Sequence, residues 1–278
     1  MTATERAFVA SAGRTGSGRA RAVHWRGLIL PVVLLVTWQG LCTSGIFTPD
    51  VMPSPAAVAA ELSRLWTKGQ LLGDIAITTW RVALGFLLGT AVATVLGAVV
   101  GYSRRAGDYL DPTMQALKAV PSLAWVPLFI LWFGIFEVSK VVLIAVGVFF
   151  PVYLNLMSGI RSTDRKLVEV GQVNGLGRID LVLLILAPSA LPSYITGLRA
   201  GLALGWMFVI AAELMGASKG LGFLMLDGQM TGRPATIVAA LLLFALVGKI
   251  SDALLVALGR RVLIGQDDFS SAQTKPAR

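Results

Sequence analysis

Cysteine and histidine each occur once in the 278 residues, as Cys42 and His24, and charged residues make up only 14% of the chain. One cysteine permits no internal disulfide. The only histidine, His24, lies in the N-terminal tail, so a histidine-based catalytic triad and a histidine metal cluster are excluded. No segment matches the GxxxxGK[ST] phosphate-binding loop, so the chain is not expected to bind ATP by that motif. These absences predict a protein that is not an enzyme and that has no cofactor or metal of its own.

Apolar residues, by contrast, make up 55% of the chain, and the mean hydropathy is +0.75. Several apolar stretches exceed the roughly 18 residues that mark a transmembrane helix. The composition therefore predicts an all-α polytopic membrane protein. Six transmembrane helices are expected, at 28–46, 82–102, 113–136, 138–159, 194–216 and 235–257.

The distribution of Lys and Arg predicts the orientation, because these residues stay in short cytoplasmic loops. With the N-terminus inside, 15 of them fall in cytoplasmic segments and six outside, Arg81 and Lys140 among the six. We therefore expect a multi-pass protein of the bacterial plasma membrane with both termini cytoplasmic. The net charge of +9 is explained by this bias and by attraction to anionic membrane lipid. No soluble basic domain is present, so nucleic acid is not an expected partner.

The segment from Glu169 to Pro192, EVGQVNGLGRIDLVLLILAPSALP, lies between two apolar blocks. Gly175 can supply the positive φ of a tight bend. The pattern predicts two short helices joined at this glycine, with Pro188 ending the second helix. Such a hairpin between membrane spans suggests a docking surface for a soluble partner.

This segment resembles the EAA loop of ABC-importer permeases, the inner-membrane subunits of binding-protein-dependent transport systems. Glu169, Gly175 and Pro188 fall at the spacing of that loop, while Val170 and Gly171 replace its two alanines. Three further strings are similar to the branch that imports aliphatic sulfonates, taurine and nitrate, and the resemblance covers Met52 to Arg261. These strings are AVPSLAWVPLFILWFGIFEVSK, FFPVYLNLMSGIRSTD and LPSYITGLRAGLALGWMFVIAAELMGASKGLGFLM.

The resemblance implies a type I ABC importer permease fold that works by ATP-driven alternating access. It implies a second copy of the chain, an ATPase subunit dimer that holds ATP and Mg, and an extracytoplasmic substrate-binding protein. The ATPase-docking residues would be Glu169, Val170, Gly171, Gly175 and Pro188. An aliphatic sulfonate is the favoured substrate, with taurine or nitrate as alternatives. An ion-coupled secondary transporter and a non-transporting membrane scaffold are the alternatives of another class.

Four parts are expected along the chain. They are a disordered basic cytoplasmic tail at 1–26, the first transmembrane helix with an external interfacial helix at 27–73, the permease core at 74–258 with its EAA loop at 161–192, and a cytoplasmic C-terminal tail at 259–278.

Small residues recur every four positions in the second and fifth expected spans, which lets another helix approach closely. Helix packing is the default interpretation, and a place along a substrate path is the alternative. The positions are Gly85, Gly89, Ala93, Gly97 and Gly101, then Gly197, Gly201 and Gly205.

Prolines mark a second set of candidate residues, because a proline frees a backbone carbonyl and broken helices often border transporter sites. Pro121, Trp125 and Pro127 are candidates for the substrate path, although kinks made for packing remain an equal alternative. Glu213 is a further candidate, since a carboxylate in a span is costly and suggests function. It could gate the outer end of the path or accept a hydrogen bond that caps the outer loop.

Overall fold

The computed structural model describes residues 26–45, 48 and 50–263, and over these residues it contains helices and no strand. The chain divides into two compact units, residues up to Pro55 and residues from Ala56 onward. The N-terminal tail expected at 1–26 lies outside the described residues except for Arg26. The C-terminal tail expected at 259–278 lies outside them beyond Leu263.

The first unit contains one helix, α2 (Arg26–Thr43), which has Pro31 in its interior. The turn that follows is tied back to this helix, because the Trp38 indole donates to the Pro53 carbonyl over 3.1 Å. The apolar part of α2, Ile29–Thr43, is shorter than a typical membrane span.

The second unit begins with α3 (Pro55–Thr67) and contains all the remaining helices. Four of the described helices are long and apolar enough to cross a membrane, and a bent pair would raise the number to five. The expected total of six is therefore not reached within the described residues. The four segments are Leu71–Tyr102, Glu137–Arg161, Ile179–Leu214 and Pro234–Arg261.

Helix α4 (Leu71–Tyr102) begins well before the expected start at residue 82. The sequence-based limit was set by Arg81, which was assigned to an outside loop. That assignment is wrong, because Arg81 lies inside α4 and is only 3% exposed. Hydrogen bonds to two carboxylates allow its charge to be buried there.

The span expected at 113–136 is not one helix. Helix α5 (Arg104–Ala119) ends before Pro121, and a 3₁₀ turn (η1, Ser122–Trp125) leads into α6 (Val126–Phe133). The two helices meet at 83°. Pro121 causes the break, since its ring disfavours a helical conformation at the preceding residue.

The expectation that Pro188 ends the second helix of the loop is also wrong. Helix α9 (Arg178–Leu181) continues through a π turn (η2, Val182–Leu186) directly into α10 (Ala187–Leu214). The amide of Ala187 donates to the carbonyl of Val182, five residues back. This wider turn shifts the helical register just before the proline, so the helix continues through it.

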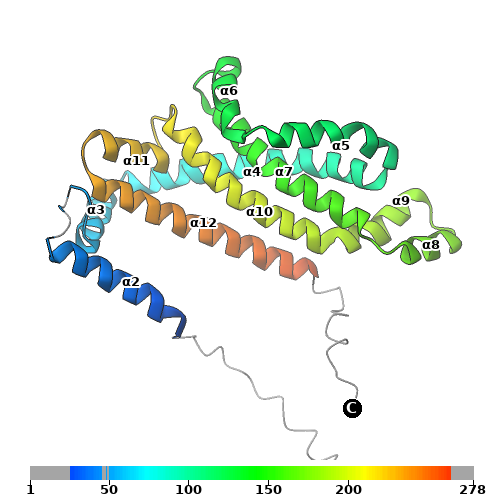
Figure 1. The fold of residues 1–278 in the computed structure, drawn as a ribbon, viewed down its shortest axis with the longest axis horizontal. Coiled ribbons are helices and arrows are strands. Elements are labelled where there is room, and N and C mark those ends of the chain that lie inside the picture. The colour runs from blue at the N-terminus through cyan, green and yellow to red at the C-terminus, as the bar shows by residue number, and fades with distance from the viewer. Residues whose placement is uncertain (1–25, 46–47, 49, 264–278) are drawn as a thin grey trace, which may run out of the picture. The chain divides into compact units, whose positions relative to one another are not determined.

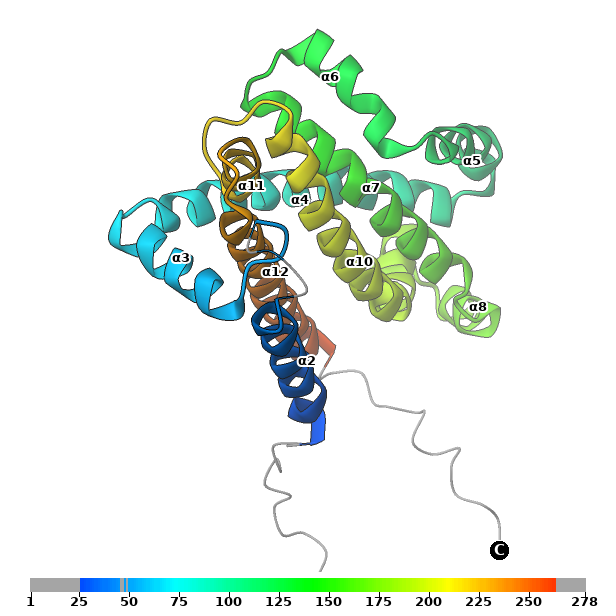
Figure 2. The ribbon, with the colours of Figure 1, turned by 60° about the vertical axis from the view of Figure 1, so that its left-hand side comes forward.

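Helix α7 (Glu137–Arg161) lies between α4 and α10 and packs along both (Figures 1 and 2). The small-residue stripe of α4 faces it: a Cβ on Gly85 would lie 2.5 Å from Ile144 Cγ2, and a Cβ on Gly89 only 2.4 Å from the Ala145 carbonyl oxygen. The stripe of α10 approaches α7 in the same way at Gly197, Gly201 and Gly205. Close helix contact thus requires small residues on both neighbours.

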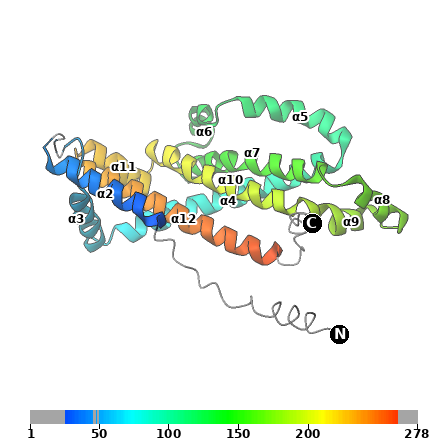
Figure 3. The same cartoon turned by 60° about the horizontal axis from the view of Figure 1, so that its bottom comes forward.

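The remaining helices complete the second unit. Figures 1 and 3 show α5 and α6 on one side of α7, and α12 (Pro234–Leu263) on the opposite side of α10. Helix α11 (Leu221–Met230) lies at one end of the three central helices, while α8 (Arg165–Val173) and α9 lie at the other (Figure 1).

Candidate functional site

The first candidate site is the hairpin of α8 and α9. Asp164 caps α8, accepting the amide of Lys166 over 2.9 Å, as acidic caps do at helix starts. Gly175 has φ 76° in the turn after α8, and the amide of Leu176 donates back to Gly171. The predicted glycine turn at this position is therefore present.

Gly171, which stands where the EAA motif has an alanine, is buried against the π turn. A Cβ at this position would lie 2.6 Å from Ile185 Cδ1. The glycine therefore lets α8 lie directly on the segment that continues into α10. A displacement of α8 would press on the start of that long helix.

The outer face of the hairpin is apolar and uncovered. Exposed large apolar residues of this kind mark interaction sites. Glu169 is also exposed, on α8. The exposed apolar side chains of α8 are Leu167, Val170 and Val173. Ile179, Leu183 and Leu184 are also exposed, but they belong to the segment that is long and apolar enough to cross a membrane.

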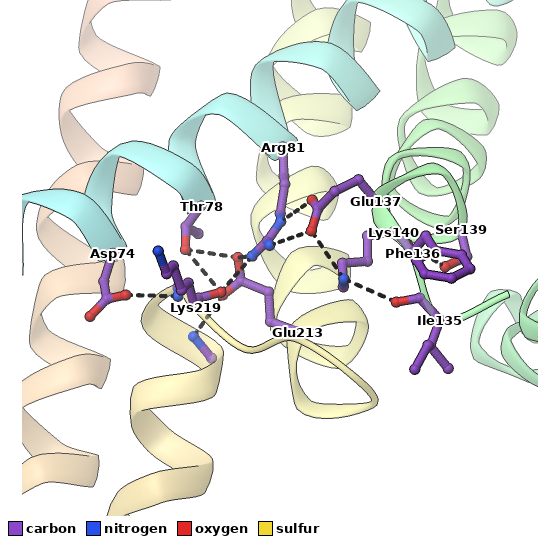
Figure 4. Close-up of polar contacts among 12 residues, drawn as sticks. Asp74, Thr78, Arg81, Ile135, Phe136, Glu137, Ser139, Lys140, Glu213 and Lys219 are labelled. Carbon is purple, nitrogen blue, oxygen red and sulfur yellow. Dashed lines mark hydrogen bonds and ion pairs between the residues drawn. The ribbon is translucent and has the colours of Figure 1, made fainter.

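The second candidate site lies at the other end of the bundle, around Glu213, which is 0% exposed (Figure 4). Asp74, Thr78 and Arg81 occupy one face of α4, since residues three and four apart are neighbours on a helix. Glu213 accepts hydrogen bonds from Arg81 Nη1 at 2.7 Å, from Thr78 Oγ1 at 2.8 Å and from the amide of Gly222 at 2.7 Å.

The same face of α4 holds the loop between α10 and α11. Arg81 donates to the Lys219 carbonyl over 2.8 Å, and Thr78 Oγ1 accepts the amide of Leu221 over 2.9 Å. Asp74 accepts the amide of Gly220 over 2.9 Å. These three hydrogen bonds are made by α4, while Glu213 itself accepts the amide of Gly222 in the first turn of α11.

Gly220 shows how tightly this loop is packed. Its φ is 122°, and a Cβ there would lie 2.6 Å from Glu213 Oε1. A side chain would therefore meet both backbone strain and the buried carboxylate.

The ion pairs extend from Arg81 to α7. Arg81 donates to Glu137 through Nε at 2.6 Å and through Nη2 at 2.7 Å. Lys140 donates to the same carboxylate over 3.1 Å and to the Ile135 carbonyl over 3.2 Å. Sequence reasoning missed Arg81 and Lys140 because it placed both in outside loops. The spacing of Asp74, Thr78 and Arg81 on one helical face could have indicated a longer α4.

The path candidates lie elsewhere. Pro121 stands at the bend and Pro127 in the first turn of α6. The Trp125 ring stacks on Phe129, with centroids 6.1 Å apart. Both aromatic residues line an apolar cavity of about 390 Å³ formed by α4, α5, η1, α6 and α7. Glu213 does not line this cavity, so the structure does not bring it together with Trp125.

Helices α10 and α12 are joined by an ion pair near the middle of α10. Arg199 donates to Asp252 through Nε at 2.9 Å and through Nη2 at 3.2 Å. Lys249 lies three residues before Asp252 on the same helix and its position is also suited to pairing with it. The carboxylate is instead bound by the arginine of the neighbouring helix.

Comparisons with known proteins agree with this fold. Residues 62–264 match the family described as "Binding-protein-dependent transport system inner membrane component". The Bacillus subtilis permease SsuC, whose name assigns it to aliphatic sulfonates transport, is 40% identical over 94% of both chains. The taurine transport system permease TauC of Escherichia coli is 31% identical over 83% of this chain and 86% of its own.

A solved structure of an amino acid ABC transporter with histidines has a TM-score of 0.59 at 15% identity. It covers 72% of this chain and 97% of its own chain, and it supports the fold alone. The long apolar helices and the family match agree with each other. The chain therefore belongs to the binding-protein-dependent transport system inner membrane components, the multi-pass permease subunits of ABC importers.

Proposed function

We propose that this permease moves aliphatic sulfonates across the bacterial plasma membrane. The observation that carries the proposal is the 40% identity to SsuC of Bacillus subtilis over nearly the whole of both chains, with 38% identity to SsuC of Escherichia coli. Taurine is the second candidate, because TauC is also similar and taurine is itself a sulfonate. Nitrate remains a third.

The proposed transporter contains a second copy of this chain, an ATPase dimer and an extracytoplasmic binding protein. ATP and Mg would be held by the ATPase subunits, which would dock on the α8–α9 hairpin around Glu169, Val170, Gly171 and Gly175. The exposed apolar face of the hairpin supports this assignment. Pro188 would help to pass the motion on, since it lies where the π turn joins α10.

ATP binding would shift the transporter between inward-open and outward-open states. This shift requires that ATP bind the two states with different affinity. Movement of α8 would reach α10 through the contact between Gly171 and Ile185. Pro121, Trp125 and Pro127 remain candidates for the path wall, and Glu213 remains a candidate for its outer gate.

The docking assignment predicts that Gly175→Pro and Glu169→Lys lose ATPase subunit during co-purification. They should also lose ATP hydrolysis stimulated by the binding protein in proteoliposomes. Gly232→Pro is a matched control for ATPase capture. It too is an uncrowded glycine with positive φ whose amide donates to a carbonyl three residues back, but it lies at the other end of the bundle. Full ATPase capture and stimulation by both hairpin variants would contradict the assignment.

The proposed orientation has both termini and the α8–α9 hairpin in the cytoplasm. It predicts that a membrane-impermeant thiol reagent added to intact cells labels Ser218→Cys and not Ser162→Cys, both in a Cys42→Ser background. Both serines are exposed and lie at opposite ends of the bundle. Labelling of Ser162→Cys from outside would contradict the proposed orientation and support the opposite one.

The substrate is tested by deleting the gene in a strain that has no redundant importer. Growth with an alkanesulfonate as sole sulfur source should fail, and the intact gene should restore it. Uptake of labelled alkanesulfonate, taurine and nitrate in the same strain ranks the three candidates. Unchanged sulfonate uptake after deletion would refute the proposed substrate.

A further inference from the structure

Two buried cations share one exposed carboxylate at the end of the bundle near α11 (Figure 4). The side chains of Arg81 and Lys140 are 3% and 6% exposed, whereas that of Glu137 is 56% exposed. Glu137 Oε1 lies 2.7 Å from Arg81 Nη2 and 3.1 Å from Lys140 Nζ, and Oε2 lies 2.6 Å from Arg81 Nε. The Glu137 carboxylate therefore contacts the two cations from the side of the cluster that is exposed.

The other side of the cluster is fixed. Glu213 binds Arg81 Nη1 and is fully buried, and it is also bound by Thr78 and by the amide of Gly222. Of the two carboxylates on Arg81, only Glu137 can leave by rotation of an exposed side chain. Its departure would leave two poorly solvated cations, which is costly unless another anion takes its place.

A sulfonate head group has the charge and the hydrogen-bond acceptors needed to replace the Glu137 carboxylate. It has the same single negative charge as a carboxylate, so the charge balance of the cluster is unchanged. Two of its oxygens can accept the paired N–H groups of Arg81, in the fork geometry that guanidinium uses for oxyanions. The third oxygen can accept from Lys140.

An apolar pocket adjoins the cations. Lys140 and Ser139 line it together with apolar side chains of α6, α7 and α10, among them Phe129 and Leu143. Its volume is about 20 Å³, which is too small for an alkyl chain. The head group would therefore bind first, and the tail would enter only when α6 moves away from α7.

We propose that Arg81 and Lys140 form an anion-exchange subsite, at which the sulfonate head group of the substrate displaces the Glu137 carboxylate. The proposal rests on the proposed function for the identity of the anion. It makes Glu137 a resident competitor of the substrate. Removing that carboxylate should create a protein that needs sulfonate for stability.

The test is thermal unfolding of the full chain in detergent, with propanesulfonate added. Glu137→Gln should unfold at lower temperature than the wild type. Propanesulfonate at ten times its Kd should raise the unfolding midpoint of Glu137→Gln by about 3–6 °C. The wild type should need at least a tenfold higher propanesulfonate concentration for the same shift. The neutral analogue propanesulfonamide should have no effect. A merely structural ion pair would be rescued equally by any small anion, so equal rescue of Glu137→Gln by propionate and by propanesulfonate would overturn the subsite.

Asp252→Asn is the matched control, because it also replaces a carboxylate that binds an arginine. Its partner Arg199 is 50% exposed, whereas Arg81 is buried, so a much smaller response to propanesulfonate is expected. Equal responses of the two variants, or no response of a folded Glu137→Gln, would overturn the subsite.

Glu137→Asp keeps the negative charge and is the test variant to use if Glu137→Gln does not fold. Its shorter side chain should compete less well, so propanesulfonate should bind it more tightly than it binds the wild type. Equal affinities would overturn the proposal. Failure of the subsite would leave sulfonate uptake by the wild type intact, whereas rescue by nitrate and not by sulfonate would refute the sulfonate assignment itself.

Discussion

Substitution of Gly89 by alanine tests the idea that α4 and α7 are held together by backbone contact. The added Cβ would lie 2.4 Å from the Ala145 carbonyl oxygen and 3.0 Å from Val148 Cβ. The carbonyl belongs to the α7 backbone, so the clash can be relieved only by moving one helix. Gly73 lies on the same helix and has no atom within 4 Å of an added Cβ, which makes Gly73→Ala a matched control.

The magnitude follows from two opposing terms. Alanine stabilises a helix interior by about 1 kcal/mol relative to glycine. Gly89→Ala gains this, while Gly73→Ala gains at most this amount because Gly73 lies in the first turn of α4. Overpacking costs typically 1–3 kcal/mol, and only Gly89→Ala incurs it. We expect the upper end of that range because the clash is with backbone. The two variants should therefore differ by about 2–3 kcal/mol, or about 4–12 °C in unfolding midpoint for a unit of this size.

The assay is thermal unfolding in one detergent at one scan rate, because the midpoint of an irreversible transition depends on the rate. Gly97→Ala provides an intermediate point, since its Cβ would lie 3.2 Å from the Tyr153 carbonyl oxygen. The expected order of midpoints is Gly73→Ala, Gly97→Ala, Gly89→Ala, from highest to lowest. A Gly89→Ala midpoint equal to that of Gly73→Ala would refute the packing argument.

Two further predictions concern charged groups. Arg81→Met should lower the free energy of unfolding by about 3–5 kcal/mol, because it leaves the buried Glu213 carboxylate without a cation. Arg199→Met should cost less, because its partner Asp252 is 30% exposed whereas Glu213 is fully buried. Equal unfolding midpoints of the two variants would contradict this. In α3, the Arg64 guanidinium binds Glu61 and lowers the pKa of Glu61 from 4.5 to about 2. Since the folded state favours the ionised carboxylate, its stabilisation is complete above about pH 4.5 and is lost as the pH falls towards 2. The difference in unfolding midpoint between the wild type and Glu61→Gln should therefore shrink between pH 7 and about pH 3, and a constant difference would count against the ion pair.

Several local features could be predicted from the sequence because they depend on neighbouring residues. Gly175 was expected at a tight turn and has positive φ there. A kink near Pro121 was expected from the restrictions that proline imposes, although the division of this span into two helices at 83° was not. The spans at 138–159 and 235–257 correspond to α7 and α12, since long apolar runs leave few other conformations in a membrane.

The errors arose where distant residues decide the outcome. The start of α4 was placed too late because a charged residue inside an apolar helix is acceptable only when it has a buried partner. That partner, Glu213, lies 132 residues further along the chain. Pro188 was expected to end a helix, but the π turn before it lets the helix continue.

The sequence by itself determined the class of protein, because hydropathy and the spacing of small residues and prolines are local properties. Its motifs also pointed to the family and to a glycine turn at Gly175. Only the tertiary structure decided which charges meet: α4, α7 and α10 bring Arg81, Glu137, Lys140 and Glu213 into one cluster. The physical reason is that a buried charge is stable only beside a partner, and partners separated by many residues become neighbours only when the helices pack.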